Sequence, residues 1–129
     1  MAEEQFLCPR CQLPLDFVVD KEVQFLGCQK CYGLWVTEPD LYSYVEKSGS
    51  PRVFVAFVEL HEKMVSGQLK KGSMRLCPFC KEKLARAQFG EHPLVLLDRC
   101  PEHGTWLDRT ELNKVIRSAR AFAGNRGEQ

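Results

Sequence analysis

The feature that most constrains this chain is a set of four ligand pairs, each with two residues between its members. Three pairs are Cys-x-x-Cys and the last is Cys-x-x-His: Cys8–Cys11, Cys28–Cys31, Cys77–Cys80 and Cys100–His103. Two turns of this kind can place four soft donors at the corners of a tetrahedron, the geometry that zinc(II) accepts. The spacers of 16 and 19 residues suit a two-stranded connection that brings two turns together.

The number of cysteines also favours metal over disulfides. Seven is an odd number, and closely spaced pairs in a reducing compartment more often bind metal. His103 makes eight donors, so we predict two zinc ions per chain. The first set is Cys8, Cys11, Cys28 and Cys31, and the second set is Cys77, Cys80, Cys100 and His103. Both sets are complete, which is typical of structural zinc and leaves no position for water or substrate.

Other chemistry is compatible with individual pairs. Cys77-Pro78-Phe79-Cys80 resembles the dithiol of a glutaredoxin, although that motif lies between a strand and a long helix and needs no further pairs. The paired turns also resemble the iron site of rubredoxins, although His103 disfavours iron in the second set. A redox switch, in which mild oxidation of the thiols releases zinc, is a third alternative.

Length and charge limit the function further. A chain of 129 residues is one ordinary domain or two very small ones. Seven thiolates and two divalent cations change the formal charge by −3, from +1 to about −2, so the chain has no overall attraction for phosphate backbones. No apolar run is long enough for a membrane span, and the N-terminus lacks the pattern of a signal peptide. We therefore expect a cytoplasmic protein.

Alternating apolar residues predict one β-hairpin between the two pairs of each set. The first is expected over residues 15–20 and 22–27, and the second over residues 84–89 and 94–99. In the first hairpin we expect four apolar side chains on one face: Phe17, Val19, Val23 and Phe25. Gly33, just after the second pair, is expected to take the positive φ that points backbone amides at a thiolate.

Helix start signals occur three times. Thr37 with Asp40 forms a capping box for a first helix that ends at Ser48-Gly49. Ser50 and Pro51 start a second helix that runs to about Ser66. Asp108, with Glu111 three residues on, is expected to cap the last helix.

The second helix has an unusually wide apolar surface, which is seldom left in water. We expect it either to be packed between the two metal units or to bind a partner or a second copy of the chain. The residues that would bind the partner are Phe54, Phe57, Val58, His61 and Met64.

The two halves of the chain repeat one plan. The first set of ligands matches the second at offsets of 69 and 72 residues, and Trp35 matches Trp106 at an offset of 71. Small changes in offset are expected from hairpins of slightly different length. We expect each tryptophan to be buried between its hairpin and the helix that follows.

The second unit closely resembles the transcription factor IIB-like zinc-finger family, small zinc ribbons found mostly in prokaryotic proteins. The resemblance rests on Cys77-Pro78-Phe79-Cys80, on the hairpin, and on the run from Asp98 to Leu112, which contains Trp106-Leu107-Asp108-Arg109. His103 replaces the usual fourth cysteine, and one residue is missing between His103 and Trp106. The first unit, from Cys8 to Leu41, resembles the family more loosely, so two tandem copies are expected.

The pattern and the resemblance together predict a small, metal-stabilised α+β chain. It consists of two zinc-ribbon hairpin units, each followed by a helix, and an extra amphipathic helix between them. We divide it into residues 1–49 (first unit with its helix), 50–73 (amphipathic helix and linker) and 74–129 (second unit with the C-terminal helix).

The function we expect is that of a non-catalytic adaptor that binds another protein or itself, because both zinc sites are closed and no catalytic constellation stands out. We expect no small-molecule substrate and no membrane. The resemblance gives the alternative, a transcription-associated ribbon that contacts nucleic acid or RNA polymerase. For that alternative the candidate phosphate-binding residues are Arg10, Lys30, Lys70, Lys71 and Arg75.

Overall fold

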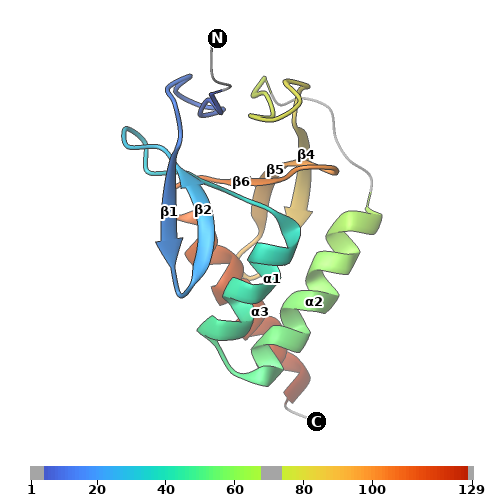
Figure 1. Ribbon diagram of the computed structural model, residues 1–129. Helices are drawn as coiled ribbons and strands as arrows, with labels where there is room; N and C mark the ends of the chain where they lie inside the picture. Colours follow the sequence, from blue (N-terminus) through green and yellow to red (C-terminus); the bar gives the residue numbers. More distant parts are fainter. Residues whose placement is uncertain (1–4, 68–73, 128–129) are drawn as a thin grey trace.

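The computed structural model describes residues 5–67 and 74–127, with side chains as far as residue 124. These residues form six strands and three helices (Figure 1). The elements are β1 (Asp16–Asp20), β2 (Val23–Gly27), β3 (Leu34–Val36), α1 (Glu38–Ser48), α2 (Pro51–Ser66), β4 (Ala85–Phe89), β5 (Val95–Cys100), β6 (Gly104–Leu107) and α3 (Glu111–Gly127). The predicted small α+β class is confirmed, with an antiparallel sheet and three helices in the described part of the chain.

A single sheet joins the two halves of the chain. Its strand order is β1-β2-β3-β6-β5-β4, and every described pair is antiparallel. The central pair places Trp35 opposite Trp106, with Leu34 opposite Leu107. Exchange of the two halves leaves this register unchanged, and the strand order reads the same from either end. We call β1–β3 with α1 the first unit and β4–β6 with α3 the second unit, and we call strand positions that match under this exchange local twofold equivalents. The sequence predicted separate hairpins and missed β3 and β6.

The two faces of the sheet carry different cores. The three helices pack together at one end of the molecule, and the cysteine-containing turns lie at the other (Figure 1). A cluster of buried aliphatic and aromatic residues, including Val36, Phe57 and Leu107, lies between sheet and helices. A second cluster contains both tryptophans and the ligand cysteines. The tryptophans are buried as predicted, but they pack toward the metal ligands and not against the helices.

Each unit holds a tryptophan of the other. A Cβ on Gly33 would lie 2.6 Å from Cη2 of Trp106 and closer still to Cζ2, so only glycine leaves room for the ring. Trp35 Nε1 donates a hydrogen bond to the carbonyl oxygen of His103 at 3.2 Å. The positive φ expected at Gly33 is found one residue earlier, at Tyr32 (φ 62°), so Gly33 is explained by packing.

The first hairpin corrects one prediction. Asp20 pairs with Val23 across a two-residue turn, Lys21-Glu22, in which both residues have positive φ. Cross-strand partners share a face, so this register puts Phe17 with Leu26 and Val19 with Gln24. Phe17 and Val19 therefore lie on the face opposite Val23 and Phe25, and both are exposed.

The helix boundaries follow the capping signals for α1 and α2. Thr37 Oγ1 accepts from the amide of Asp40 at 3.3 Å, and Ser50 Oγ accepts from the amide of Val53 at 3.3 Å. Helix α3 begins at Glu111, later than expected, and the amide of Asp108 donates to Glu111 Oε1 at 2.8 Å. This bond is the Glu111 half of the predicted capping box, and the Asp108 carboxylate itself accepts from Trp106 Nε1 at 3.0 Å.

Helix α2 packs against α1, α3 and β4, and this burial corrects part of the predicted partner surface. Phe57, His61 and Met64 are inside the chain, with exposed fractions of 0, 2 and 4%. They are not available to a partner, whereas Phe54 and Val58 are half-buried at the surface. The wide apolar surface of α2 is thus mostly explained by the core of its own chain.

A buried polar group connects the units beneath α2. Arg99 on β5 donates to Glu38 Oε2 on α1 at 2.7 Å, and the Arg99 side chain is 4% exposed. His61 Nδ1 lies 3.0 Å from the Tyr42 hydroxyl, and burial lowers the pKa of His61. The Arg99–Glu38 ion pair therefore links a strand of the second unit to a helix of the first.

Candidate metal centres

Three of the four ligand turns share one backbone geometry. In each, the residue after the second cysteine has left-handed φ: Gln12 (62°), Tyr32 (62°) and Lys81 (66°). Its amide donates to the carbonyl oxygen of the first cysteine at 2.9, 2.9 and 3.0 Å. This fold aims backbone amides at the first sulfur, as from Arg10 to Cys8 Sγ at 3.3 Å.

The fourth turn is tighter. The amide of His103 donates to the Cys100 carbonyl oxygen at 3.2 Å, one residue earlier than in the other three turns. Gly104 follows with φ 134°, and a Cβ there would overlap the carbonyl oxygen of Val36. The residue missing between His103 and Trp106 is accommodated by this glycine, which lets the chain enter β6 directly.

The structure brings together all four residues of each predicted set. The first group is Cys8, Cys11, Cys28 and Cys31, and the second is Cys77, Cys80, Cys100 and His103. Within each group the donor atoms lie within 4.8 Å of one another. All seven cysteines are free thiols. In each group two members are buried and two are partly exposed.

The distances between donors fit a tetrahedral zinc site. A zinc–sulfur bond of about 2.3 Å gives a sulfur–sulfur edge of about 3.8 Å, and a zinc–nitrogen bond of about 2.0 Å gives a sulfur–nitrogen edge of about 3.5 Å. Cys8 Sγ lies 3.8 Å from Cys31 Sγ, and Cys80 Sγ lies 3.8 Å from Cys100 Sγ. His103 Nδ1 lies 3.7 Å from Cys77 Sγ and 3.4 Å from Cys100 Sγ.

The electrostatics of the thiols agree with a cation at each centre. Burial raises the pKa of the Cys8 thiol to about 12 and that of Cys77 to about 11, so neither ionises alone at neutral pH. Burial also opposes ionisation of Cys28, but amides that donate to its sulfur lower its pKa to about 7. A divalent cation deprotonates such thiols and offsets their charge. The two groups fit two zinc ions, one each.

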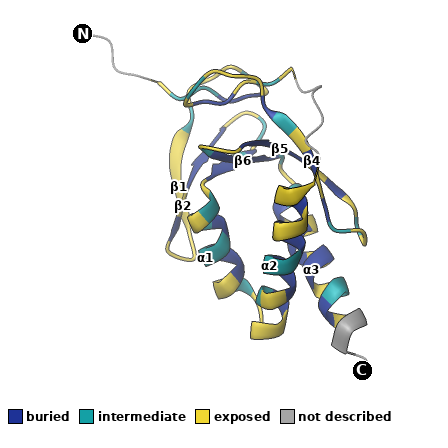
Figure 2. Cartoon of the chain, turned by 90° about the vertical axis from the view of Figure 1, so that its right-hand side faces the viewer, coloured by how far each residue is buried: buried dark blue, intermediate teal, exposed yellow. Residues whose placement is uncertain are grey.

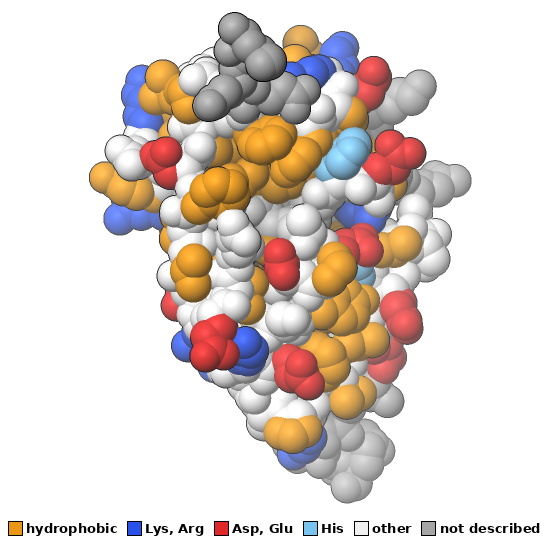
Figure 3. All heavy atoms as spheres, viewed as in Figure 1, with side chains coloured by type: hydrophobic (Ala, Val, Ile, Leu, Met, Phe, Trp, Pro, Cys, Tyr) orange, Lys and Arg blue, Asp and Glu red, His pale blue; other side chains and the backbone are white. Residues whose placement is uncertain are grey.

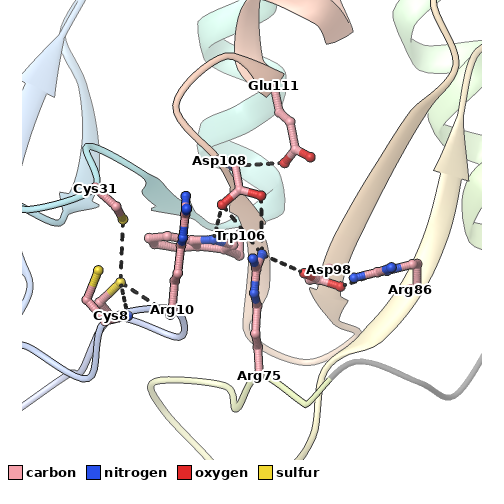
Figure 4. A network of polar contacts seen from close by, with 10 residues as sticks. Cys8, Arg10, Cys31, Arg75, Arg86, Asp98, Trp106, Asp108 and Glu111 are labelled. Atoms are coloured by element: carbon pink, nitrogen blue, oxygen red, sulfur yellow. Dashed lines mark hydrogen bonds and ion pairs between the residues drawn. The ribbon is translucent and has the colours of Figure 1, made fainter.

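Figure 4 shows an ionic network that the sequence did not predict, drawn together with Cys8 and Cys31 of the first centre. The Arg75 guanidinium contacts Asp98 at 3.1 Å and Asp108 at 3.2 Å, and Arg86 contacts Asp98 at 3.4 Å. Burial raises the pKa of Glu111 to about 7, and the negative charges of Asp108 and Asp98 add to the effect. Arg75 and Asp98 each stand two residues before a ligand cysteine, the only signal in the sequence.

Of the predicted phosphate-binding residues, the structure describes three: Arg10, Lys30 and Arg75. Arg75 forms ion pairs with the carboxylates of Asp98 and Asp108, and this corrects its predicted role as a phosphate-binding residue. Arg10 and Lys30 are exposed on turns of the first centre. Lys70 and Lys71 lie outside the described residues. Acidic and basic side chains are interspersed on the face shown in Figure 3, where hydrophobic side chains gather below the metal-binding turns and over α2.

None of the helices in the described part of the chain has the length and apolarity needed to cross a membrane. Comparison with the curated proteins gave no match, and comparison with solved structures gave none either. Comparison with protein families gave a match over residues 76–118 to the family described as transcription factor zinc-finger. The second unit, with its Cys₃His centre, is therefore similar to a transcription factor IIB-type zinc ribbon.

Proposed function

We propose that the chain is a non-catalytic adaptor, in which two structural zinc ions hold two ribbon units in one sheet and the surface binds another protein. The observation that carries the proposal is that both donor sets are complete and tetrahedral in spacing. A zinc ion with four protein ligands has no open position for water or substrate, so its contribution is to folding.

The first unit is, in this proposal, a second copy of the ribbon matched in the second unit. Its elements follow the same order, β-β-β-α, and its two turns hold four cysteines in the same places. Two such units in tandem double the surface that a single small ribbon can offer. The cytoplasmic location expected from the sequence belongs to the same proposal.

The experiment compares capture of partner proteins by the zinc-loaded chain and by Cys28→Ser, which breaks the first centre. An adaptor captures a defined protein with the wild type and loses it with the variant. Sedimentation of the wild type in the same buffer tests self-association. An inert monomer that captures nothing contradicts the adaptor function.

A transcription-associated ribbon is the second candidate, favoured by the match over residues 76–118. Arg10 and Lys30, exposed at the first centre, are the described basic residues it would use. Filter binding of duplex DNA, single-stranded DNA and RNA across a salt series tests contact with nucleic acid. If the chain contacts phosphates, its affinity falls steeply as the salt concentration rises. Co-sedimentation with purified RNA polymerase tests the other form of this candidate.

A further inference from the structure

Strand β1 is exposed along its whole length (Figure 2). It stands at one end of the sheet, and β2 is its only strand neighbour in the described part of the chain. Phe17 is 71% exposed and Val19 is 70% exposed, and both point to the face opposite the helices. An apolar edge strand with unpaired backbone groups is a template for pairing with another strand.

The second unit supplies an internal comparison, because β4 is the local twofold equivalent of β1. Arg86 pairs with Asp98 as Phe17 pairs with Leu26, and Gln88 pairs with Leu96 as Val19 pairs with Gln24. The outward side chains of β4 are thus Arg86 and Gln88, which are typical of a protected edge. The first unit has an apolar residue at each of these two positions.

A second difference lies beside the first. In the second unit Asp98 binds Arg75 and Arg86. The equivalent residues of the first unit are Leu26, Phe6 and Phe17. The backbone supports the match, since Leu15 donates to the carbonyl of Phe6 as Leu84 donates to that of Arg75. An ionic group in one unit is therefore an apolar group in the other.

Packing within the chain does not account for Phe17 and Val19. Helix α2 covers β4 on the helix side, where Phe89 is buried, whereas the equivalent residue of β1 is the exposed Asp20. On that side β1 has its two aspartates, with Val18 between them at 39% exposure. On the opposite side Phe17 and Val19 are 71 and 70% exposed with no polar residue between them, and this contrast points to an interface.

The charges on β1 select its partner. Asp16 and Asp20 flank the apolar residues, and neither forms an ion pair among the described residues; they accept from Gln29 and Tyr44. A second copy paired antiparallel about Val18 would place Asp16 opposite the other copy's Asp20, which is unfavourable at both ends. A strand with Lys or Arg at these two positions would instead form two opposite-charge pairs.

We propose that β1 is a docking edge for an extended segment of a partner protein, in which apolar residues contact Phe17 and Val19 and flanking Lys or Arg residues face Asp20 and Asp16. This inference rests on the proposed adaptor function and identifies its binding surface. Main-chain hydrogen bonds to the free edge would hold the segment, and the alternating side chains would select it.

The test uses two peptides, Ser-Lys-Val-Thr-Val-Lys-Ser and a control with Glu in place of both Lys, added to the ¹⁵N-labelled, zinc-loaded chain. The expected result is that amide shifts concentrate in residues 15–27 and that the Lys peptide binds at least about tenfold more tightly than the Glu peptide. When the Lys peptide is bound, the backbone amide hydrogens of β1 exchange more slowly with solvent.

Three variants make the test specific. Phe17→Arg with Val19→Gln gives β1 the outward residues of β4, so the fold and zinc content stay unchanged while peptide binding falls about tenfold or more. Asp16→Lys with Asp20→Lys reverses the preference in favour of the Glu peptide. Val55→Gln removes another exposed valine, 59% exposed on α2, and leaves binding unchanged.

The proposal is overturned if the shifts fall elsewhere, if both peptides bind equally, or if the Phe17→Arg/Val19→Gln variant binds like the wild type. It is also overturned if the wild type dimerises and this variant does not, because the occupant is then a second copy. If a captured partner protein is retained by the variant, the β1 site fails while the adaptor function stands.

Discussion

Replacement of Gly33 by alanine tests the contact through which the two units hold each other. The added methyl group would lie within 3.0 Å of three atoms of the Trp106 ring. Trp106 is fully buried, so other side chains surround the ring and oppose its displacement. Overpacking of this kind costs about 1–3 kcal/mol. The φ angle of Gly33 is outside the left-handed region, so alanine can adopt it. Alanine therefore also raises the free energy of unfolding by about 0.4–1 kcal/mol, because it reduces the conformational entropy of the unfolded chain.

The difference between this cost and this gain is a net loss of about 0–2.6 kcal/mol. Its middle value, about 1.3 kcal/mol, lowers the melting temperature of a chain of this size by about 4–8 °C. Thermal and urea unfolding of Gly33→Ala and the wild type, both with excess zinc, measure it. Gly124→Ala is the matched control, because a Cβ there meets nothing within 4 Å and alanine favours the helix.

The Trp106→Phe background isolates the contact, since phenylalanine lacks the outer ring atoms that a Cβ on Gly33 would meet. The loss caused by Gly33→Ala shrinks there, with a coupling free energy on the order of 1 kcal/mol. If Gly33→Ala is as harmless as Gly124→Ala, or if its cost is the same in both backgrounds, the two units do not meet through Trp106.

Three further predictions follow from the cores and the centres. Burial raises the pKa of Glu111 to about 7 from an ordinary value of 4.5, so the unfolded chain releases this proton at lower pH than the folded chain does. The free energy of unfolding therefore falls as pH rises from about 4.5 to 7, and Glu111→Gln removes this fall. If urea unfolding gives the wild type and Glu111→Gln the same pH dependence across that range, the carboxyl is not buried. Glu38→Gln leaves Arg99 buried without its charge partner and costs about 1–3 kcal/mol in denaturant unfolding, whereas Glu22→Gln, in an exposed pair with Lys47, costs close to nothing; equal effects would contradict the difference in burial. A strong chelator removes much of the helical circular-dichroism signal, because each unit is too small to fold on its apolar core alone; a melting curve unchanged by zinc removal would falsify the structural role of the metal.

The sequence identified local structure and the ligand groups well, because these depend on short-range signals. The spacing of the cysteines fixed two sets of donors, and Thr37 and Ser50 marked where α1 and α2 begin. The burial of both tryptophans was also foreseen. Each of these inferences needed only a few neighbouring residues and a general rule of backbone or ligand chemistry.

The features that the sequence did not reveal depend on how distant segments meet. Three-residue strands such as β3 are too short to show alternation, so the pairing of Trp35 with Trp106 was hidden. The register of the first hairpin depends on the conformation of Lys21-Glu22, which are not typical residues for positive φ. The apolar pattern of α2 predicted a buried surface, but it did not indicate whether that surface packs within the same chain or against a partner.

In the proposed function, the stability that the small units lack comes from two zinc ions, each held by four side chains. Native mass spectrometry with elemental analysis of the same sample tests this claim most directly. We predict two zinc ions per chain, seven reduced thiols, and about one zinc ion in Cys100→Ser. A folded chain that contains no metal, or that is crosslinked through disulfides, would contradict it.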